Sequence, residues 1–226
     1  MENTDSPESA AASLVPLDDA QARILGCLVE KAAITPEAYP LTLNALVAAC
    51  NQKTSREPVM NLEPGAVGHA LNELERRGLV KIAPASQRAL RYEHRFDPVY
   101  GTTARQRAVL CALLLRGPQT LNELHTRTER LAEFPSVDDL RDTLDRLIQR
   151  EPACVVRLGR GAGQREDRYM HLLAGPVDVE ALASAPPPAA SARGGAHERI
   201  EQLEAEVAQL REELARLRDR LDAAGV

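Results

Sequence analysis

One pattern occurs twice in this chain, about 80 residues apart, and this repeat constrains the fold more than any other feature. Each copy begins with an apolar-striped helix, over 21–28 or 106–113, and continues with two further helices. Each copy ends in similar strand-like residues, Arg91-Tyr-Glu-His94 and Arg168-Tyr-Met-His171. A repeated unit of three helices and a hairpin predicts two tandem winged helix-turn-helix domains, α+β in class and mainly helical.

Local signals predict the bounds of the elements. In the first copy we expect a helix capped by Asp18 or Asp19, helices over 41–50 and 64–77, the latter ended by Gly78, and strands over 79–83 and 90–96. In the second copy we expect Gly117-Pro118 to end the first helix, Thr120 and Ser136 to cap the next two, and strands over 153–158 and 166–173.

The same signals divide the chain into five segments. We expect a disordered N-terminus over 1–16, winged-helix domains over 17–98 and 99–174, an Ala/Pro/Gly-rich linker over 175–197, and a coiled-coil helix over 198–224.

Charge bears directly on the nature of the partner. Hydrophobic residues make up 44% of the chain and the net charge is −5. Residues 17–98 carry ten acidic and ten basic side chains, and residues 99–173 carry ten acidic and twelve basic. Dedicated DNA-binding domains are usually basic on one face, so this balance argues against tight unaided binding to DNA.

Four cysteines, Cys27, Cys50, Cys111 and Cys154, stand apart without a C-x-x-C pair. We expect them to be buried structural thiols and expect neither a metal nor another cofactor. No signal peptide or membrane-spanning segment is apparent, so the sequence predicts a cytoplasmic protein without membrane contact.

Motifs for catalysis are missing: the chain contains no P-loop, no G-x-G-x-x-G after a strand, no G-x-S-x-G and no H-E-x-x-H. The glycines between Gly159 and Gly163 lie in a hairpin turn flanked by arginines, which is typical of a wing. His94 and His171 recur at the ends of the hairpins, where a solvated or locally bonded role is the simpler interpretation. We therefore expect a protein that is not an enzyme.

The third helices decide whether DNA is a plausible partner, because this helix enters the major groove in winged-helix proteins. In the first copy its outward residues include Ala66, His69, Asn72, Glu73 and Arg76; asparagine suits adenine and arginine suits guanine. Two glycines, at 65 and 68, weaken the helix by about 1 kcal/mol each.

The third helix of the second copy carries Asp138, Asp139, Asp142 and Asp145, which would face phosphates in a groove. We therefore expect a structural or protein-facing surface there, beside a wing whose arginines either follow a DNA backbone or are only solvated. The candidate nucleic-acid contacts of the whole chain are Lys53, Arg56, His69, Asn72, Arg76, Arg88, Arg157, Arg160 and Arg165.

The C-terminal segment has an a/d heptad pattern over about three heptads. Its predicted seam consists of Ile200, Leu203, Val207, Leu210, Leu214, Leu217 and Leu221. In a parallel homodimer the flanking residues form pairs of opposite charge, Arg199–Glu204, Glu206–Arg211 and Glu213–Arg218. The alternative is a single amphipathic helix packed on the body of the protein.

Several longer motifs resemble the bacterial YceH family, over about residues 17–174. They include Tyr39-Pro-Leu-Thr-Leu-Asn44, Ala49-Cys-Asn-Gln-Lys53, Leu113-Leu-Leu-Arg-Gly-Pro-Gln-Thr120 and Arg168-Tyr-Met-His-Leu172. The resemblance implies a tandem winged-helix fold. It does not by itself indicate a function, because one fold serves many functions.

Together these features predict a regulatory protein that binds double-stranded DNA and forms a homodimer through its tail. The alternative is an adaptor whose winged-helix domains bind other proteins and not DNA.

Overall fold

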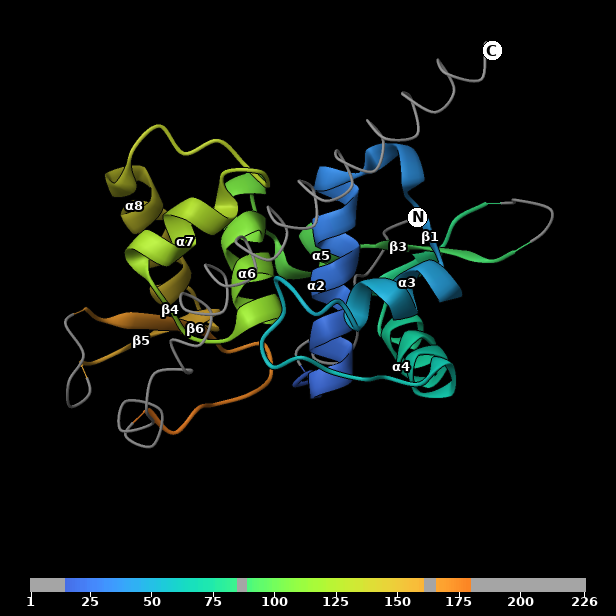
Figure 1. Ribbon diagram of the computed structural model, residues 1–226. Coiled ribbons are helices and arrows are strands. Elements are labelled where there is room, and N and C mark those ends of the chain that lie inside the picture. Colours follow the sequence, from blue (N-terminus) through green and yellow to red (C-terminus); the bar gives the residue numbers. More distant parts are fainter. Residues whose placement is uncertain (1–14, 85–88, 161–165, 180–226) are drawn as a thin grey trace, which may run out of the picture. The chain divides into compact units, whose positions relative to one another are not determined.

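The computed structural model describes residues 15–84, 89–160 and 166–179 (Figure 1). Most of the predicted N-terminal segment, most of the linker and the whole heptad seam lie outside the described residues, and so do Arg88 and Arg165.

The repeat appears in the structure as the same order of elements. The first copy contains α2 (Asp19–Ile34), η1 (Pro36–Ala38), β1 (Leu41–Thr42), α3 (Leu43–Cys50), α4 (Pro64–Arg76), β2 (Val80–Ile82) and β3 (Arg91–His94). The short α5 (Phe96–Tyr100) joins it to the second copy, which contains α6 (Ala104–Arg116), β4 (Gln119–Thr120), α7 (Leu121–Thr128), α8 (Val137–Ile148), β5 (Val155–Leu158) and β6 (Arg168–His171). Within the described residues the protein is α+β, with seven α-helices and two small antiparallel sheets.

Helix ends follow the predicted local signals. The Asp18 carboxylate accepts a hydrogen bond from the backbone N–H of Gln21 at 2.7 Å, and the Gln21 side chain accepts one from the backbone N–H of Asp18 at 3.3 Å. Thr120 and Ser136 cap α7 and α8 as expected. Gly78, just past the end of α4, has a φ of 71°, which is the left-handed conformation that favours glycine at this position.

Each sheet has three strands, in the orders β1-β3-β2 and β4-β6-β5. The register repeats as well: Thr42 lies opposite Arg91 in the first sheet, and Thr120 lies opposite Arg168 in the second. The two-residue strands β1 and β4 were not predicted, because they are too short to show an alternating pattern.

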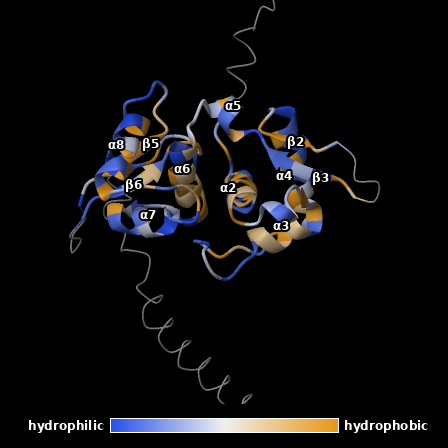
Figure 2. Ribbon diagram, turned by 90° about the horizontal axis from the view of Figure 1, so that it is seen from above, coloured by the Kyte–Doolittle hydropathy of each residue, from blue (hydrophilic) through white to orange (hydrophobic). Residues whose placement is uncertain are grey.

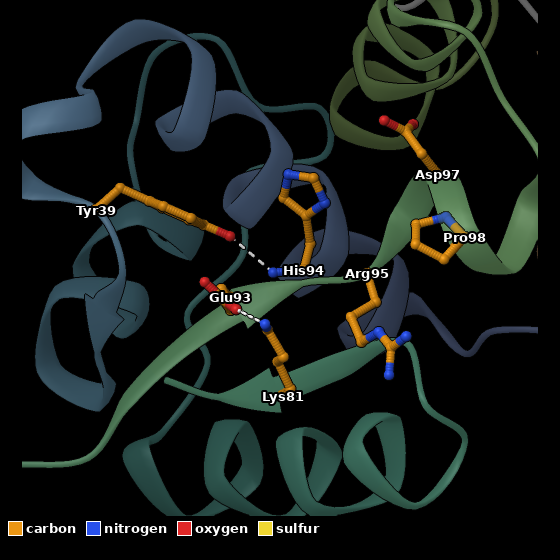
Figure 3. A pocket seen from close by; sticks show the side chains of 7 residues that line it. All are labelled: Tyr39, Lys81, Glu93, His94, Arg95, Asp97 and Pro98. Carbon is orange, nitrogen blue, oxygen red and sulfur yellow. Dashed lines mark hydrogen bonds and ion pairs between the residues drawn. The ribbon is translucent and has the colours of Figure 1, made fainter. Parts of the chain in front are cut away.

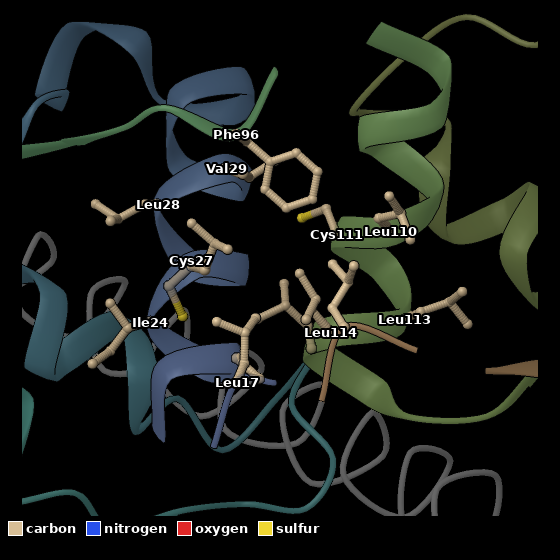
Figure 4. Packing of buried hydrophobic residues seen from close by; sticks show 14 of the residues in the cluster. Leu17, Ile24, Cys27, Leu28, Val29, Phe96, Leu110, Cys111, Leu113 and Leu114 are labelled. Carbon is tan, nitrogen blue, oxygen red and sulfur yellow. The ribbon is translucent and has the colours of Figure 1, made fainter. Parts of the chain in front are cut away.

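The two copies pack through their first helices, and α2 lies beside α6 in both views (Figures 1 and 2). Because α2 contacts α6 on one side and α3 and α4 on another, its residues 21–30 are all buried. Figure 4 shows Phe96, Cys111 and Leu114 between the two helices. Gly26 allows this close approach, since a Cβ there would lie only 2.9 Å from Cδ2 of Leu115.

All four predicted strands were longer than the observed ones; the strand expected over 90–96, for example, ends at His94, and Phe96 begins α5. Phe96 is fully buried and its ring lies 4.8 Å from that of Tyr100, so core packing turns the chain into a helix there. The expected domain boundary between 98 and 99 therefore falls inside α5.

Candidate nucleic-acid interface

The exposed face of α4 is the most direct candidate for contact with nucleic acid. The helix begins with Pro64 in its first turn and buries Val67, Leu71 and Leu74 completely against the core. The helical period therefore places Gly65, His69, Asn72 and Arg76 in one row on the opposite side. The side chains of His69 and Arg76 are 75% and 71% exposed, which leaves them free to meet a ligand.

Glu73 flanks this row and neutralises part of its charge. Its Oε1 lies 3.6 Å from Nε2 of His69 and 3.4 Å from Nη2 of Arg76. The exposed Arg76–Glu73 pair contributes about 0.2–0.5 kcal/mol, so a ligand can break it. The α4 face thus carries an amide and two side chains that donate hydrogen bonds, with one carboxylate beside them.

Gly65 and Gly68 lie on open surface, where an added Cβ would meet no other atom within 4 Å. Their helix-weakening effect is therefore not offset by close packing within the protein. Because glycine has no side chain, these two positions allow a large ligand to approach the backbone of the first turns of α4 closely.

The loop between α3 and α4 carries Lys53, which is exposed as a contact residue must be. Asn51 braces the loop, because its Nδ2 donates to the carbonyl of Leu62 at 2.9 Å and its Oδ1 accepts from the Leu62 N–H at 2.7 Å. The buried Arg23 of α2 also holds it, donating to the carbonyl of Pro58 at 2.6 Å.

Arg56 was a candidate contact, and the structure instead places it in the interior. Its Nη1 and Nη2 donate to the two carboxylate oxygens of Glu30, and its Nε donates to the carbonyl of Ala49 at 3.0 Å. Burial favours a raised pKa for Glu30, but the hydrogen bonds and charge of Arg56 outweigh it and hold this pKa below the ordinary value. We therefore remove Arg56 from the candidate surface.

The hairpin of the second copy presents Arg157 and Arg160 on the surface, and both lie against the carboxylate of Asp167. The hydrogen bond from Arg157 lowers the pKa of Asp167 and raises that of Arg157. Arg168, which the sequence places beside the same turn, is buried in the sheet. The described part of this hairpin therefore carries two exposed cations and two acids, Glu166 and Asp167.

The acidic face expected on α8 is present. Asp138 is 82% exposed, and Asp142 and Asp145 are exposed as well. Asp139 lies 3.6 Å from Nη1 of Arg105. Arg141, which pairs with Asp138, and the exposed Arg146 leave this helix with four acids against two cations, which disfavours contact with a DNA backbone.

Two exposed cations at the first hairpin, Lys81 and Arg95, were not predicted as contact residues (Figure 3). Strand alternation was the available signal, since Val80 and Tyr92 face the core and their neighbours Lys81 and Glu93 therefore face outward. Lys81 forms an ion pair with Glu93. These side chains line a hollow of about 590 Å³ beside Tyr39.

His94 is bonded locally as expected, because its Nδ1 accepts from the Phe96 backbone N–H at 3.3 Å, whereas His171 is buried and is not solvated. Burial, with the nearby charge of Arg107, lowers the pKa of His94 to about 4, and its backbone N–H donates to the hydroxyl of Tyr39 at 2.7 Å. Burial alone lowers the pKa of His171 to about 4. At neutral pH both are uncharged and add no positive potential for nucleic acid.

All four cysteines are buried and unpaired, as expected. Burial raises the pKa of the Cys111 and Cys154 thiols, which keeps them protonated. Among the described residues, no group of three histidine, cysteine or acidic side chains is placed to hold a metal ion. Within the same part of the chain, no helix is long and apolar enough to cross a membrane.

Comparisons with known proteins show which family the chain belongs to. A UPF0502 protein of Xanthomonas axonopodis pv. citri is 57% identical over 215 residues, covering 92% of this chain and 96% of the relative. UPF0502 proteins of Stenotrophomonas maltophilia and Mesorhizobium japonicum are 53% and 52% identical over 213 and 209 residues, covering 91% and 92% of this chain and 95% and 96% of the relatives. Coverage of 92% of 226 residues cannot end before about residue 208, so the similarity extends through the Pro-rich segment and into the heptad tail. A family profile matches residues 17–164, and the chain therefore belongs to the family described as "Protein of unknown function, DUF480".

Proposed function

We propose that this chain is a tandem winged-helix protein that binds double-stranded DNA as a regulatory factor and has no enzymatic activity. In this reading α3 and α4 form the helix-turn-helix of the first domain, and β2 and β3 form its wing. The second domain repeats the scheme with α7, α8, β5 and β6. The repeated element order and sheet register support this assignment, as does the resemblance to the YceH family.

The observation that carries the proposal is the exposed row on α4. In a winged-helix domain this helix lies in the major groove, and His69, Asn72 and Arg76 would face the base edges. Two glycines keep the leading turns of the helix smooth. Lys53 and the exposed arginines of the second hairpin would add phosphate contacts, which strengthen binding without reading sequence.

Fluorescence anisotropy with a labelled mixed-sequence duplex, titrated at low and moderate salt, tests the proposal. We expect binding that weakens steeply as salt rises, because phosphate neutralisation releases counterions. Arg76→Ala should reduce affinity by about 1–3 kcal/mol in free energy. Arg130→Ala is a matched control, since Arg130 is also exposed but lies away from α4, and it should have no effect. Absence of binding at low salt and tens of micromolar protein contradicts the proposal.

A second candidate function is a protein-protein adaptor, and the acidic face of α8 favours it. Asp138, Asp142 and Asp145 would suit a basic protein surface better than a DNA groove. The adaptor function would be favoured if the protein does not bind the duplex and if the Asp138→Asn/Asp142→Asn variant loses binding to a protein partner.

We further propose that the heptad tail forms a parallel coiled coil between two copies of the chain. The seam and the opposite charges beside it support this pairing. Two tethered copies would bind neighbouring sites at raised effective concentration. The four unpaired thiols fit a cytoplasmic location.

A further inference from the structure

Gln21, a residue of α2, reaches the candidate DNA-reading face of α4 through its side-chain amide. The side chain is buried, and its Nε2 donates to Oε2 of Glu73 at 2.8 Å. Its Oε1 accepts from Nη1 of Arg77 at 2.8 Å. An amide oxygen accepts and an amide nitrogen donates, so Arg77 fixes the orientation of the amide with its nitrogen toward Glu73.

Gln21 thereby holds Oε2 of Glu73, and Oε1 faces His69 and Arg76 of the exposed row. Oε1 of Glu73 is 3.4 Å from Nη2 of Arg76 and 3.6 Å from Nε2 of His69. The carboxylate is about one-third exposed, compared with 71% for Arg76, so it is the more constrained partner. A flexible arginine on a helix surface samples many rotamers, and an anchored carboxylate limits that choice.

The same carboxylate also opposes contact with a DNA backbone. A negative charge beside the row penalises phosphate binding by Arg76, whereas the edge of guanine offers neutral acceptors, N7 and O6. An arginine held by Glu73 should therefore bind phosphate less favourably and guanine by preference.

We propose that Glu73, anchored by Gln21, is the positioning residue that directs Arg76 to the major-groove edge of guanine and suppresses indiscriminate phosphate binding. This inference rests on the proposed DNA-binding function. It adds a ligand class, guanine-containing duplex DNA, and a residue that determines specificity without itself reading that base.

The test compares two duplexes of one mixed sequence, with all guanines either normal or replaced by 7-deazaguanine. The replacement removes the N7 acceptor and leaves the phosphate charge unchanged. Wild-type protein should bind the 7-deazaguanine duplex about tenfold more weakly. Glu73→Gln should reduce this tenfold discrimination by about twofold, which is what an exposed pair of this kind contributes. It should also bind both duplexes more tightly, with a steeper dependence on salt.

Glu75→Gln is the matched control, because it removes the same charge from an exposed position of the same helix. Among the described residues, the Glu75 side chain makes no ion pair with His69 or Arg76. We expect it to retain the tenfold discrimination against 7-deazaguanine. Thermal unfolding of both variants verifies that each remains folded.

The outcomes separate the two proposals. If wild-type protein binds neither duplex, the DNA-binding function itself fails. If it binds both duplexes equally, DNA binding stands and the role of Glu73 is wrong. Equal loss of discrimination in Glu73→Gln and Glu75→Gln would also overturn it, because net charge alone would then explain the effect.

Discussion

Arg56 and Glu30 form a two-point ion pair in the interior, with 3.0 Å from Nη1 to Oε1 and 2.5 Å from Nη2 to Oε2. The guanidinium is completely shielded from solvent. A second bond from Nη1 reaches the carbonyl of Ser55 at 2.8 Å, so the pair also holds the loop that carries Lys53. A charge that could have faced a ligand instead connects that loop to α2.

Removing one partner of this pair should be strongly destabilising. Glu30→Gln leaves the guanidinium of Arg56 buried without its counter-charge, and such losses cost about 3–5 kcal/mol. Urea unfolding at neutral pH measures the change. The double variant Glu30→Gln/Arg56→Met should lose less than the sum of the single variants, and strict additivity would show that the residues do not interact.

Two glycines on neighbouring helices should respond in opposite directions. Gly68→Ala should raise stability by about 0.5–1 kcal/mol, because alanine favours a helix and its Cβ enters open space. Gly26→Val should lower stability by roughly 1–3 kcal/mol, because the added atoms collide with Leu115 and Leu114 of α6. Thermal melts of both variants test this, and a stabilised Gly26→Val would contradict the described packing of α2 on α6.

Stability should fall in mild acid because of His171. Its pKa is about 4 in the folded protein because of burial, against about 6.5 when unfolded. The unfolded chain therefore binds more protons between these values, so this contribution is complete above about pH 6.5 and is lost as the pH falls toward 4, by up to about 3 kcal/mol. Unfolding titrations across this range should show a shallower slope for His171→Gln than for wild type or for the exposed control His69→Gln. An NMR titration of His171 near pH 6.5 would refute the prediction.

Substitutions in the second copy should distinguish a residue that contacts DNA phosphates, Arg160, from one that repels them, Asp142. Arg160→Ala should weaken binding to every duplex alike, since a phosphate contact carries no sequence information. Asp142→Ala should leave binding unchanged or slightly improve it, because it removes a negative charge. Anisotropy with several duplex sequences measures both. Loss of binding in Asp142→Ala would mean that α8 does take part in recognition.

The tail should control the oligomeric state. Leu210→Asp places a charge in the predicted seam and should give a monomer in which both copies of the repeat remain folded. Glu206→Arg should weaken the dimer by bringing like charges together across the seam. Sedimentation of the full chain beside a truncated protein ending at His197 measures the effect. If both sediment as monomers at tens of micromolar, the homodimer is disproved.

Features that depend on neighbours in sequence were predictable from the chain alone. Asp18, Thr120 and Ser136 cap helices, and Gly78 follows α4 in the left-handed conformation. Each of these rests on contacts within a few residues, which any chain with that sequence can form. The row on α4 was predictable for the same reason, because the helical period alone separates Asn72 and Arg76 from the buried leucines.

Only the tertiary structure decided which charges face solvent. Arg56 and Glu30 are 26 residues apart, and Gln21 and Glu73 are 52 apart, so no local pattern joins them. Burial of Arg23 follows from α2 having neighbours on two sides, which its composition does not reveal. Sequence periodicity reports which face of a helix can be buried, whereas burial of a charge depends on a partner that arrives only when distant segments pack.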